Sequence, residues 1–93
     1  ADIINVVCAR FDVRQADLLS RKKSKSIVFP RQICMHIARR LTRHSLEEIG
    51  GFFGGRDHTT VMHADDKIRT QIKTDDSLST LVDKIAEELQ AAR

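Results

Sequence analysis

A polar pentad, RDHTT at residues 56–60, directly follows four glycines that fall within six positions of the stretch IGGFFGGRDHTTV. Glycines of this density either form a loop that cradles a phosphate or make a tight turn that presents the next side chains to a partner. A phosphate loop reads GxxxxGK followed by Ser or Thr, between a strand and a helix. The GxxxxG half is present, but Arg56 and Asp57 replace the lysine and the hydroxyl. A carboxylate at that place would repel phosphate, so the sequence favours the turn.

The pentad itself has the chemistry of a nucleic-acid reader. Arg56 can reach a phosphate or a guanine, and His58 can donate to an acceptor on a base edge. Thr59 and Thr60 each carry a hydroxyl and a methyl group, which can touch a thymine methyl. Asp57 would be repelled by DNA unless it caps a helix or accepts from a cytosine amine. Each residue alone has an ordinary surface interpretation, and only their conjunction indicates base reading.

The segments around the pentad predict a helix-turn-helix over about residues 46–73. Ser45 followed by Glu48 forms a capping box that opens a short helix. We expect the four glycines to end that helix. Asp57 is then the N-cap of a longer helix, whose buried stripe is expected to contain Val61, Ala64, Ile68 and Ile72.

The rest of the chain predicts further helices and no strands, hence one all-α domain over residues 1–93. Apolar spacing predicts a helix over about residues 2–11 and one or two turns ending near residue 19. Residues 20–26 are polar and basic, which indicates an exposed loop. Pro30 is expected in the first turn of the second long helix, with Arg31 off its apolar stripe. A last helix is expected over about residues 77–92.

Positive charge is concentrated in one part of the chain. From residue 18 to residue 46 there are eight Lys or Arg and no Asp or Glu, whereas the remaining 64 residues sum to −5. Such segregation indicates a polyanionic partner, although a solvated basic face without a partner remains the alternative. Aromatic residues, on which single-stranded RNA bases would stack, number only four, so duplex DNA is favoured over RNA.

Several other classes are disfavoured. No apolar run approaches the roughly 18 residues of a membrane span, and no leader is visible, so we expect a soluble intracellular fragment. Cys8 and Cys34 fall on apolar helix faces, where a disulfide framework is not expected. The histidines and Cys34 lack familiar metal-ligand spacing. A phosphate-handling enzyme would need a nucleophile beside a base, and nucleotide-dependent heat stabilisation would be its test.

The blocks FDVRQADLLS, PRQICMHIARRLT, SLEEIG and IGGFFGGRDHTTVMHADDKI together resemble the C-terminal DNA-binding domain of the bacterial replication initiator DnaA family. The resemblance extends over nearly residues 1–73, in order and in spacing. It implies a fold similar to the Trp repressor group, and a helix-turn-helix that reads a short asymmetric DNA box at the replication origin. A transcriptional regulator that shares this domain is the alternative.

The resemblance also assigns roles to residues. Major-groove reading would fall to Arg56, Asp57, His58, Thr59 and Thr60. Minor-groove contact would come from the basic loop, with Arg21, Lys22, Lys23 and Lys25. Phosphate contacts would come from Arg31, Gln32, Arg39 and Ser45. Lys23 stands where many members carry Arg, and Glu47 where many carry Pro, which could weaken or alter readout.

The resemblance further implies what surrounds this domain in a parent protein. An ATPase module would lie upstream, so the fragment itself is expected to bind no ATP, no metal and no other cofactor, and not to be an enzyme. Oligomerisation would depend on the upstream domains, with the fragment monomeric. Double-stranded DNA at the origin is the expected partner, in the bacterial cytoplasm at the nucleoid.

Overall fold

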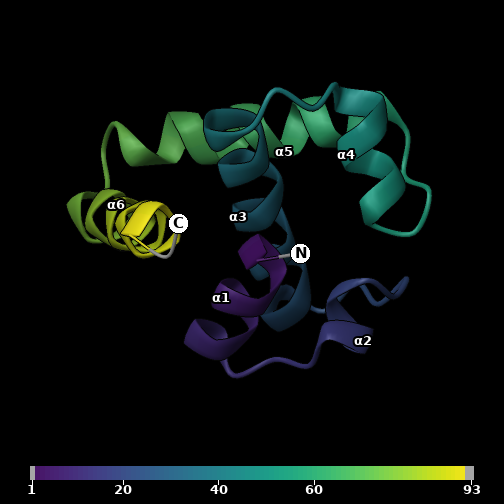
Figure 1. The fold of residues 1–93 in the computed structure, drawn as a ribbon, viewed down its shortest axis with the longest axis horizontal. Coiled ribbons are helices and arrows are strands. Elements are labelled where there is room, and N and C mark those ends of the chain that lie inside the picture. Colours follow the sequence, from purple (N-terminus) through teal and green to yellow (C-terminus); the bar gives the residue numbers. More distant parts are fainter. Residues whose placement is uncertain (1, 92–93) are drawn as a thin grey trace.

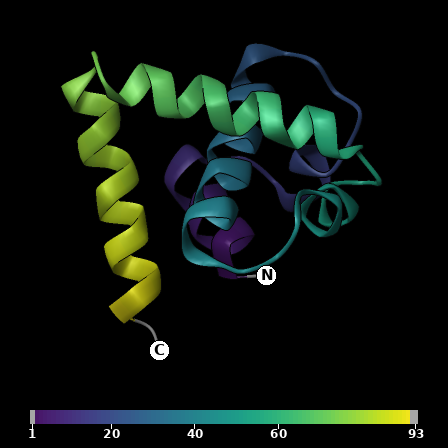
Figure 2. The same ribbon diagram turned by 90° about the horizontal axis from the view of Figure 1, so that it is seen from above.

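The computed structural model describes residues 2–91, which fold into helices with no strand in that range (Figures 1 and 2). The prediction of an all-α fold is confirmed. The helices are α1 (Asp2–Phe11), α2 (Gln15–Leu18), α3 (Lys25–Leu41), α4 (Leu46–Phe52), α5 (His58–Ile72) and α6 (Asp76–Ala91). None of these helices is both long enough and apolar enough to cross a membrane.

Helix α3 is the centre of the core. Its residues Ile33, Cys34 and Ile37 are fully buried, and α3 contacts each of the other five helices. Its largest contact is with α5, which crosses it as the long horizontal helix of Figure 2. This crossing fixes the position of α5 relative to the basic segment.

Cys8 and Cys34 are both free thiols, and burial raises the pKa of Cys34.

The start of α3 differs from the prediction. The helix begins at Lys25 after the N-cap Ser24, so Pro30 lies inside it and not in its first turn. The carbonyl of Ser24 accepts from the amides of Ile27 and Val28, at 3.0 and 2.9 Å. Pro30 removes only one helical hydrogen bond, and the extra turn buries Ile27. The exposed loop is correspondingly shorter than residues 20–26, because Lys25 and Ser26 belong to α3.

The glycines also divide differently from the prediction. Gly50 and Gly51 lie within α4, whereas Gly54 and Gly55 form the turn with φ angles of 78° and 76°. Those left-handed angles are costly for residues with a Cβ. Only the second pair of glycines thus adopts the left-handed conformation.

The last helix, α6, begins after Asp75, whose Oδ1 accepts from the amide of Leu78 at 3.0 Å. It buries Leu78, Val82 and Ile85 and packs against α1, α3 and α5. The helix predicted over residues 77–92 is therefore present from residue 76, and residue 92 lies outside the described residues.

Candidate nucleic-acid interface

The capping box opens α4 as the sequence predicted. Ser45 Oγ accepts from the amide of Glu48 at 3.1 Å, and Glu48 Oε1 accepts from the amide of Ser45 at 2.9 Å. These bonds lower the pKa of Glu48. Ser45 was predicted to contact phosphate. Its Oγ only accepts in the cap, so the hydroxyl can still donate from this exposed position, and the phosphate contact stays a prediction.

The connection between α4 and α5 is unusually tight at Gly50. The amides of Phe53 and Arg56 both donate to the Gly50 carbonyl, at 3.1 and 3.0 Å. A Cβ on Gly50 would lie 1.9 Å from the Arg56 carbonyl oxygen, so no larger residue fits without moving the turn. Gly50 is thus the residue that allows α5 to start so close to α4.

Asp57 is the N-cap of α5, which confirms the predicted capping role. Its Oδ1 accepts from the amide of Thr60 at 2.9 Å and from the Thr60 hydroxyl at 3.2 Å. The amide bond is the main cause that lowers the pKa of Asp57, so the carboxylate is ionised at neutral pH. The cap uses one carboxylate oxygen and draws Thr60 back towards the helix start.

The first turn of α5 presents polar side chains to solvent. His58 and Thr60 are exposed, and Thr59 is half-buried. Further along the same helix, His63 and Lys67 line a hollow of about 300 Å³ together with Thr60 and with Gln32 of α3. His63 and Lys67 were not among the predicted site residues. Their spacing was the available signal, because His63 lies three residues after Thr60 and Lys67 four residues after His63, and residues spaced in this way share one helix face.

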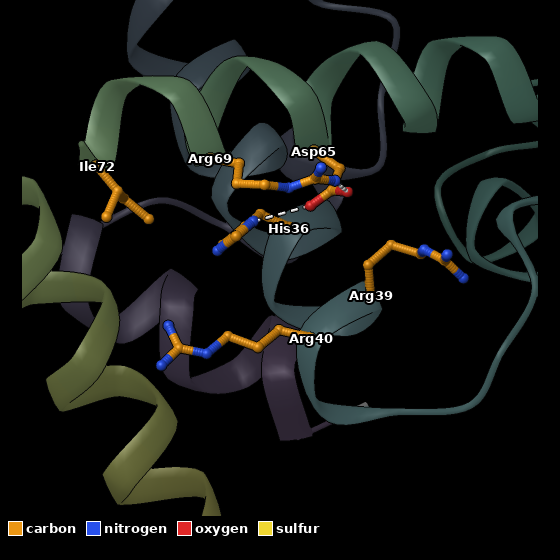
Figure 3. A pocket seen from close by; sticks show the side chains of 6 residues that line it. All are labelled: His36, Arg39, Arg40, Asp65, Arg69 and Ile72. Carbon is orange, nitrogen blue, oxygen red and sulfur yellow. Dashed lines mark hydrogen bonds and ion pairs between the residues drawn. The ribbon is translucent and has the colours of Figure 1, made fainter.

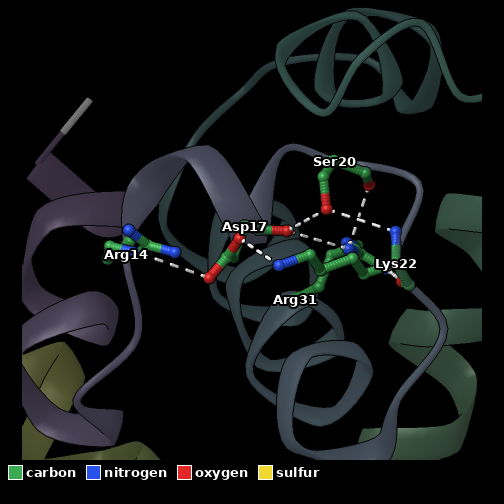
Figure 4. Close-up of polar contacts among 5 residues, drawn as sticks. All are labelled: Arg14, Asp17, Ser20, Lys22 and Arg31. Carbon is green, nitrogen blue, oxygen red and sulfur yellow. Dashed lines mark hydrogen bonds and ion pairs between the residues drawn. The ribbon is translucent and has the colours of Figure 1, made fainter.

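The basic loop, here residues 19–24, is held from inside by Arg31. Nε of Arg31 donates to the carbonyl of Leu18 at 2.7 Å and Nη1 to that of Lys22 at 3.1 Å. Nη2 donates to the carbonyls of Ser20 at 3.0 Å and Asp17 at 3.3 Å (Figure 4). Burial, followed by repulsion from Arg56, lowers the pKa of Arg31.

Arg31 is only 5 % exposed, so the prediction that it lies off the buried face of its helix is wrong. Its guanidinium donates to carbonyls where α2 ends, which are not bonded within a helix. Helical periodicity cannot predict such a contact. Four of the five N–H donors of Arg31 already bond these carbonyls, and the side chain is only 5 % exposed, so little of it is available to a phosphate. This geometry fits a residue that shapes the loop better than one that touches a backbone phosphate.

The cations of the loop and of the adjoining first turn of α3 face outward. Arg21, Lys22 and Lys23 of the loop are exposed, and so is Lys25 of α3. Lys22 Nζ lies 2.7 Å from Asp17 Oδ1, an ion pair whose hydrogen bond is the main cause that lowers the pKa of Asp17. Lys22 is therefore partly neutralised, whereas its exposed neighbours extend the positive face.

Two of the predicted phosphate contacts, Gln32 and Arg39, lie on opposite sides of α5. Gln32 is half-buried beside Thr60, and its Oε1 has no hydrogen-bond partner among residues 2–91. Arg39 is exposed and donates weakly to the carbonyl of His44 at 3.4 Å. The structure thus separates two residues that a helical repeat places on one face of α3.

Arg39 belongs to a second hollow of about 430 Å³ (Figure 3), whose charges nearly cancel. Asp65 is buried there and accepts from Nδ1 of His36 at 2.9 Å, and it also pairs with Arg69. The side chains that line this hollow are those of His36, Arg39, Arg40, Asp65, Arg69 and Ile72. The cations are offset by Asp65, by Asp66 against Arg69 and by Asp83 against Arg40. Most of the positive charge around this hollow is therefore paired within the protein, and the phosphate contact of Arg39 stays a prediction. No group of three metal-binding side chains occurs in residues 2–91.

The geometry is that of a short capped helix, a glycine turn and a longer helix with an exposed polar start, and it coincides with a family match. Residues 1–68 match the model described as the bacterial dnaA protein helix-turn-helix. The chain belongs to this DnaA helix-turn-helix family. The match contains α4, the turn and most of α5, and it ends before α6.

Curated relatives agree with the DnaA assignment. A chromosomal replication initiator protein DnaA from Limosilactobacillus reuteri is 45 % identical over 91 residues, 98 % of this chain and 21 % of the relative. DnaA of Levilactobacillus brevis is 49 % identical over 84 residues, 90 % of this chain and 19 % of the relative. DnaA of Rhodopseudomonas palustris is 46 % identical over 89 residues, 96 % of this chain and 19 % of the relative. The chain therefore spans about a fifth of the length of these DnaA proteins.

Proposed function

We propose that this chain binds double-stranded DNA in a sequence-specific manner, as the origin-binding module of a replication initiator. The carrying observation is the polar start of α5, where His58 and Thr60 are exposed and Thr59 is half-buried, beside an outward-facing basic loop. Membership of the DnaA family favours replication initiation over a role in transcription. Under this proposal the N-terminal end of α5 enters the major groove.

Affinity and specificity come from different residues. Arg21, Lys23 and Lys25 are exposed cations, and their approach to DNA phosphates or to the minor groove releases counterions. His58 and Thr59 have unbonded polar groups that can meet base edges. Asp57 acts chiefly as the cap, because Oδ1 already accepts two hydrogen bonds. Its second oxygen can accept from a cytosine amine.

The principal test is selection of bound duplexes from a random pool, followed by affinity measurement. We expect one enriched asymmetric motif. His58→Ala or Thr59→Ala should cost about 1 to 3 kcal/mol on that motif and much less on random duplex. Thr70→Ala is the matched control, because Thr70 is exposed at the far end of the same helix. Equal losses of affinity on both duplexes would show that His58 and Thr59 do not read bases. If the selection enriched no motif, the proposal itself would be refuted.

The electrostatic part has its own test. Lys23→Gln should weaken binding to all duplexes and reduce the slope of log affinity against log salt by about one. Lys84→Gln makes the same charge change on the exposed face of α6, away from the loop. If both variants lowered affinity and slope alike, the effect would be one of net charge and not of the loop.

A further inference from the structure

The basic loop and the helix-turn-helix turn meet at one carbonyl oxygen. The carbonyl of Ser20 accepts from Nη2 of Arg56 at 2.6 Å and from Nη2 of Arg31 at 3.0 Å. The other terminal nitrogen of Arg56, Nη1, donates to the carbonyl of Phe53. One side chain thus joins the end of α4 to a loop that lies 36 residues earlier in the chain.

The backbones approach closely at the same place. A Cβ on Gly54 would lie 3.0 Å from the carbonyl oxygen of Leu19. Gly54 also has a left-handed φ of 78°, so the turn has both a conformational and a steric need for glycine. The contact between turn and loop is therefore built from main chain as well as from Arg56.

Both terminal nitrogens of Arg56 donate to carbonyls of the protein, and the side chain is half-buried. Burial, followed by repulsion from Arg21, lowers the pKa of Arg56. A guanidinium held in this way is turned inward, whereas a base reader extends its fork towards guanine.

We propose that Arg56 is a positioning residue, which fixes the basic loop relative to the start of α5 and does not itself read DNA. This inference rests on the proposed function. The contact sets the distance between the loop cations and His58, and hence the spacing between minor-groove and major-groove contacts on the duplex. Because the loop cations and the start of α5 are held in place before DNA binds, the entropy cost of ordering the loop on the duplex is avoided.

A double-mutant cycle between Arg56 and Lys23 tests the proposal, with duplex affinity measured by fluorescence anisotropy. Lys23→Gln should lower affinity about five- to tenfold in the wild-type chain. In the Arg56→Met background the same change should have less than about twofold effect, because the loop is no longer placed against the duplex. Lys67→Gln is the matched control. It lies on α5 itself, so its effect should be the same in both backgrounds.

Two further measurements separate positioning from direct contact. Arg56→Lys keeps the charge but cannot span two carbonyls, so it should behave like Arg56→Met in the cycle. In the free protein, before any DNA is added, amide hydrogen exchange of residues 21–24 should speed up in both Arg56 variants. Circular dichroism confirms that each variant is folded before the cycle is read.

The outcomes distinguish the inference from the function on which it rests. Additive effects of Arg56→Met and Lys23→Gln would overturn the positioning role, because a residue that touches DNA directly acts independently. Unchanged exchange of residues 21–24 would also overturn it. If duplex affinity were insensitive to Lys23→Gln and His58→Ala alike, the proposed function would fail, while faster exchange would still establish the contact between turn and loop.

Discussion

Replacement of Gly50 by alanine tests the packing of the turn most directly. A Cβ at this position would lie 1.9 Å from the Arg56 carbonyl oxygen and 3.0 Å from its carbon. Ordinary contact begins at 3.4 Å, so the oxygen is about 1.5 Å too close. Both atoms that must move are backbone, and no rotation of a side chain can relieve the clash. The variant must therefore separate the end of α4 from the start of α5.

The size of the effect follows from two opposing contributions. Alanine in a helix is favoured over glycine by about 1 kcal/mol. Overpacking a filled site costs about 1 to 3 kcal/mol, and here the displaced group is backbone that also forms the Arg56-to-Gly50 hydrogen bond. With overpacking at the severe end of that range, about 3 kcal/mol, and a helix-propensity gain of about 1 kcal/mol, we expect Gly50→Ala to lower the free energy of unfolding by about 2 kcal/mol net.

Gly51→Ala is the matched control, since it lies next in the same helix with no atom within 4 Å of the added Cβ. It should raise the free energy of unfolding by about 0.5 to 1 kcal/mol. Urea unfolding followed by circular dichroism measures both variants under identical conditions. If Gly50→Ala were as stable as Gly51→Ala, the close approach of α4 and α5 described above would be wrong.

Three further predictions concern single residues. Arg31→Met should destabilise the domain by about 2 to 4 kcal/mol in urea unfolding, because the carbonyls that it bonds lose a buried charged donor. Arg31→Lys should restore little of this stability, and full restoration would contradict the role of the planar guanidinium. Because the pKa of Asp57 is lowered in the folded state, its stabilising contribution is present above about pH 4 and is lost as pH falls through the lowered value. The Tm advantage of the wild type over Asp57→Asn should shrink on acidification, and a constant difference would contradict this linkage. Glu47→Gln removes an exposed carboxylate from the first turn of α4 and should raise affinity for every duplex by up to about 1 kcal/mol in anisotropy titrations. Unchanged affinity would show that Glu47 lies away from the DNA.

Local signals in the sequence identified most helix starts correctly. Ser45 with Glu48 and the single Asp57 each act through hydrogen bonds that span three residues, so their effect does not depend on the rest of the fold. The apolar stripes of α1 and α5 were likewise recognisable, because a buried helix face repeats every three or four residues.

Local signals failed where packing compensated a local cost. Pro30 lies inside α3 although proline in a helix interior costs about 3 kcal/mol, and the additional helical turn before it buries Ile27 against the fold. Gly50 lies in a helix that it disfavours by propensity, because only a residue without a Cβ fits beneath the Arg56 carbonyl. In both cases the deciding neighbour is defined by the fold and not by adjacent residues.

In the candidate interface too, some features follow from the local sequence and others from the fold. The exposed polar start of α5 follows from a cap and a glycine turn, which are sequence features. The inward orientation of Arg31 and Arg56 depends on carbonyls of the loop, contributed by Leu18 and Ser20 from a distant part of the chain. The family resemblance assigned DNA contacts to both arginines, and neither that resemblance nor the charge of the segment shows which cations already donate to carbonyls of the protein.

The all-α class, the capped helix-turn-helix and the basic segment follow from the amino-acid sequence alone, because capping, amphipathic periodicity and charge act over a few neighbouring residues. The packing of the folded chain sets which arginines face the solvent, why Gly50 cannot be larger and how the basic loop is joined to the turn. Those features arise where residues distant in the sequence come into contact, such as Ser20 and Arg56, which lie 36 residues apart. A hydrogen bond at that range is set by the packing of α3 against its neighbours.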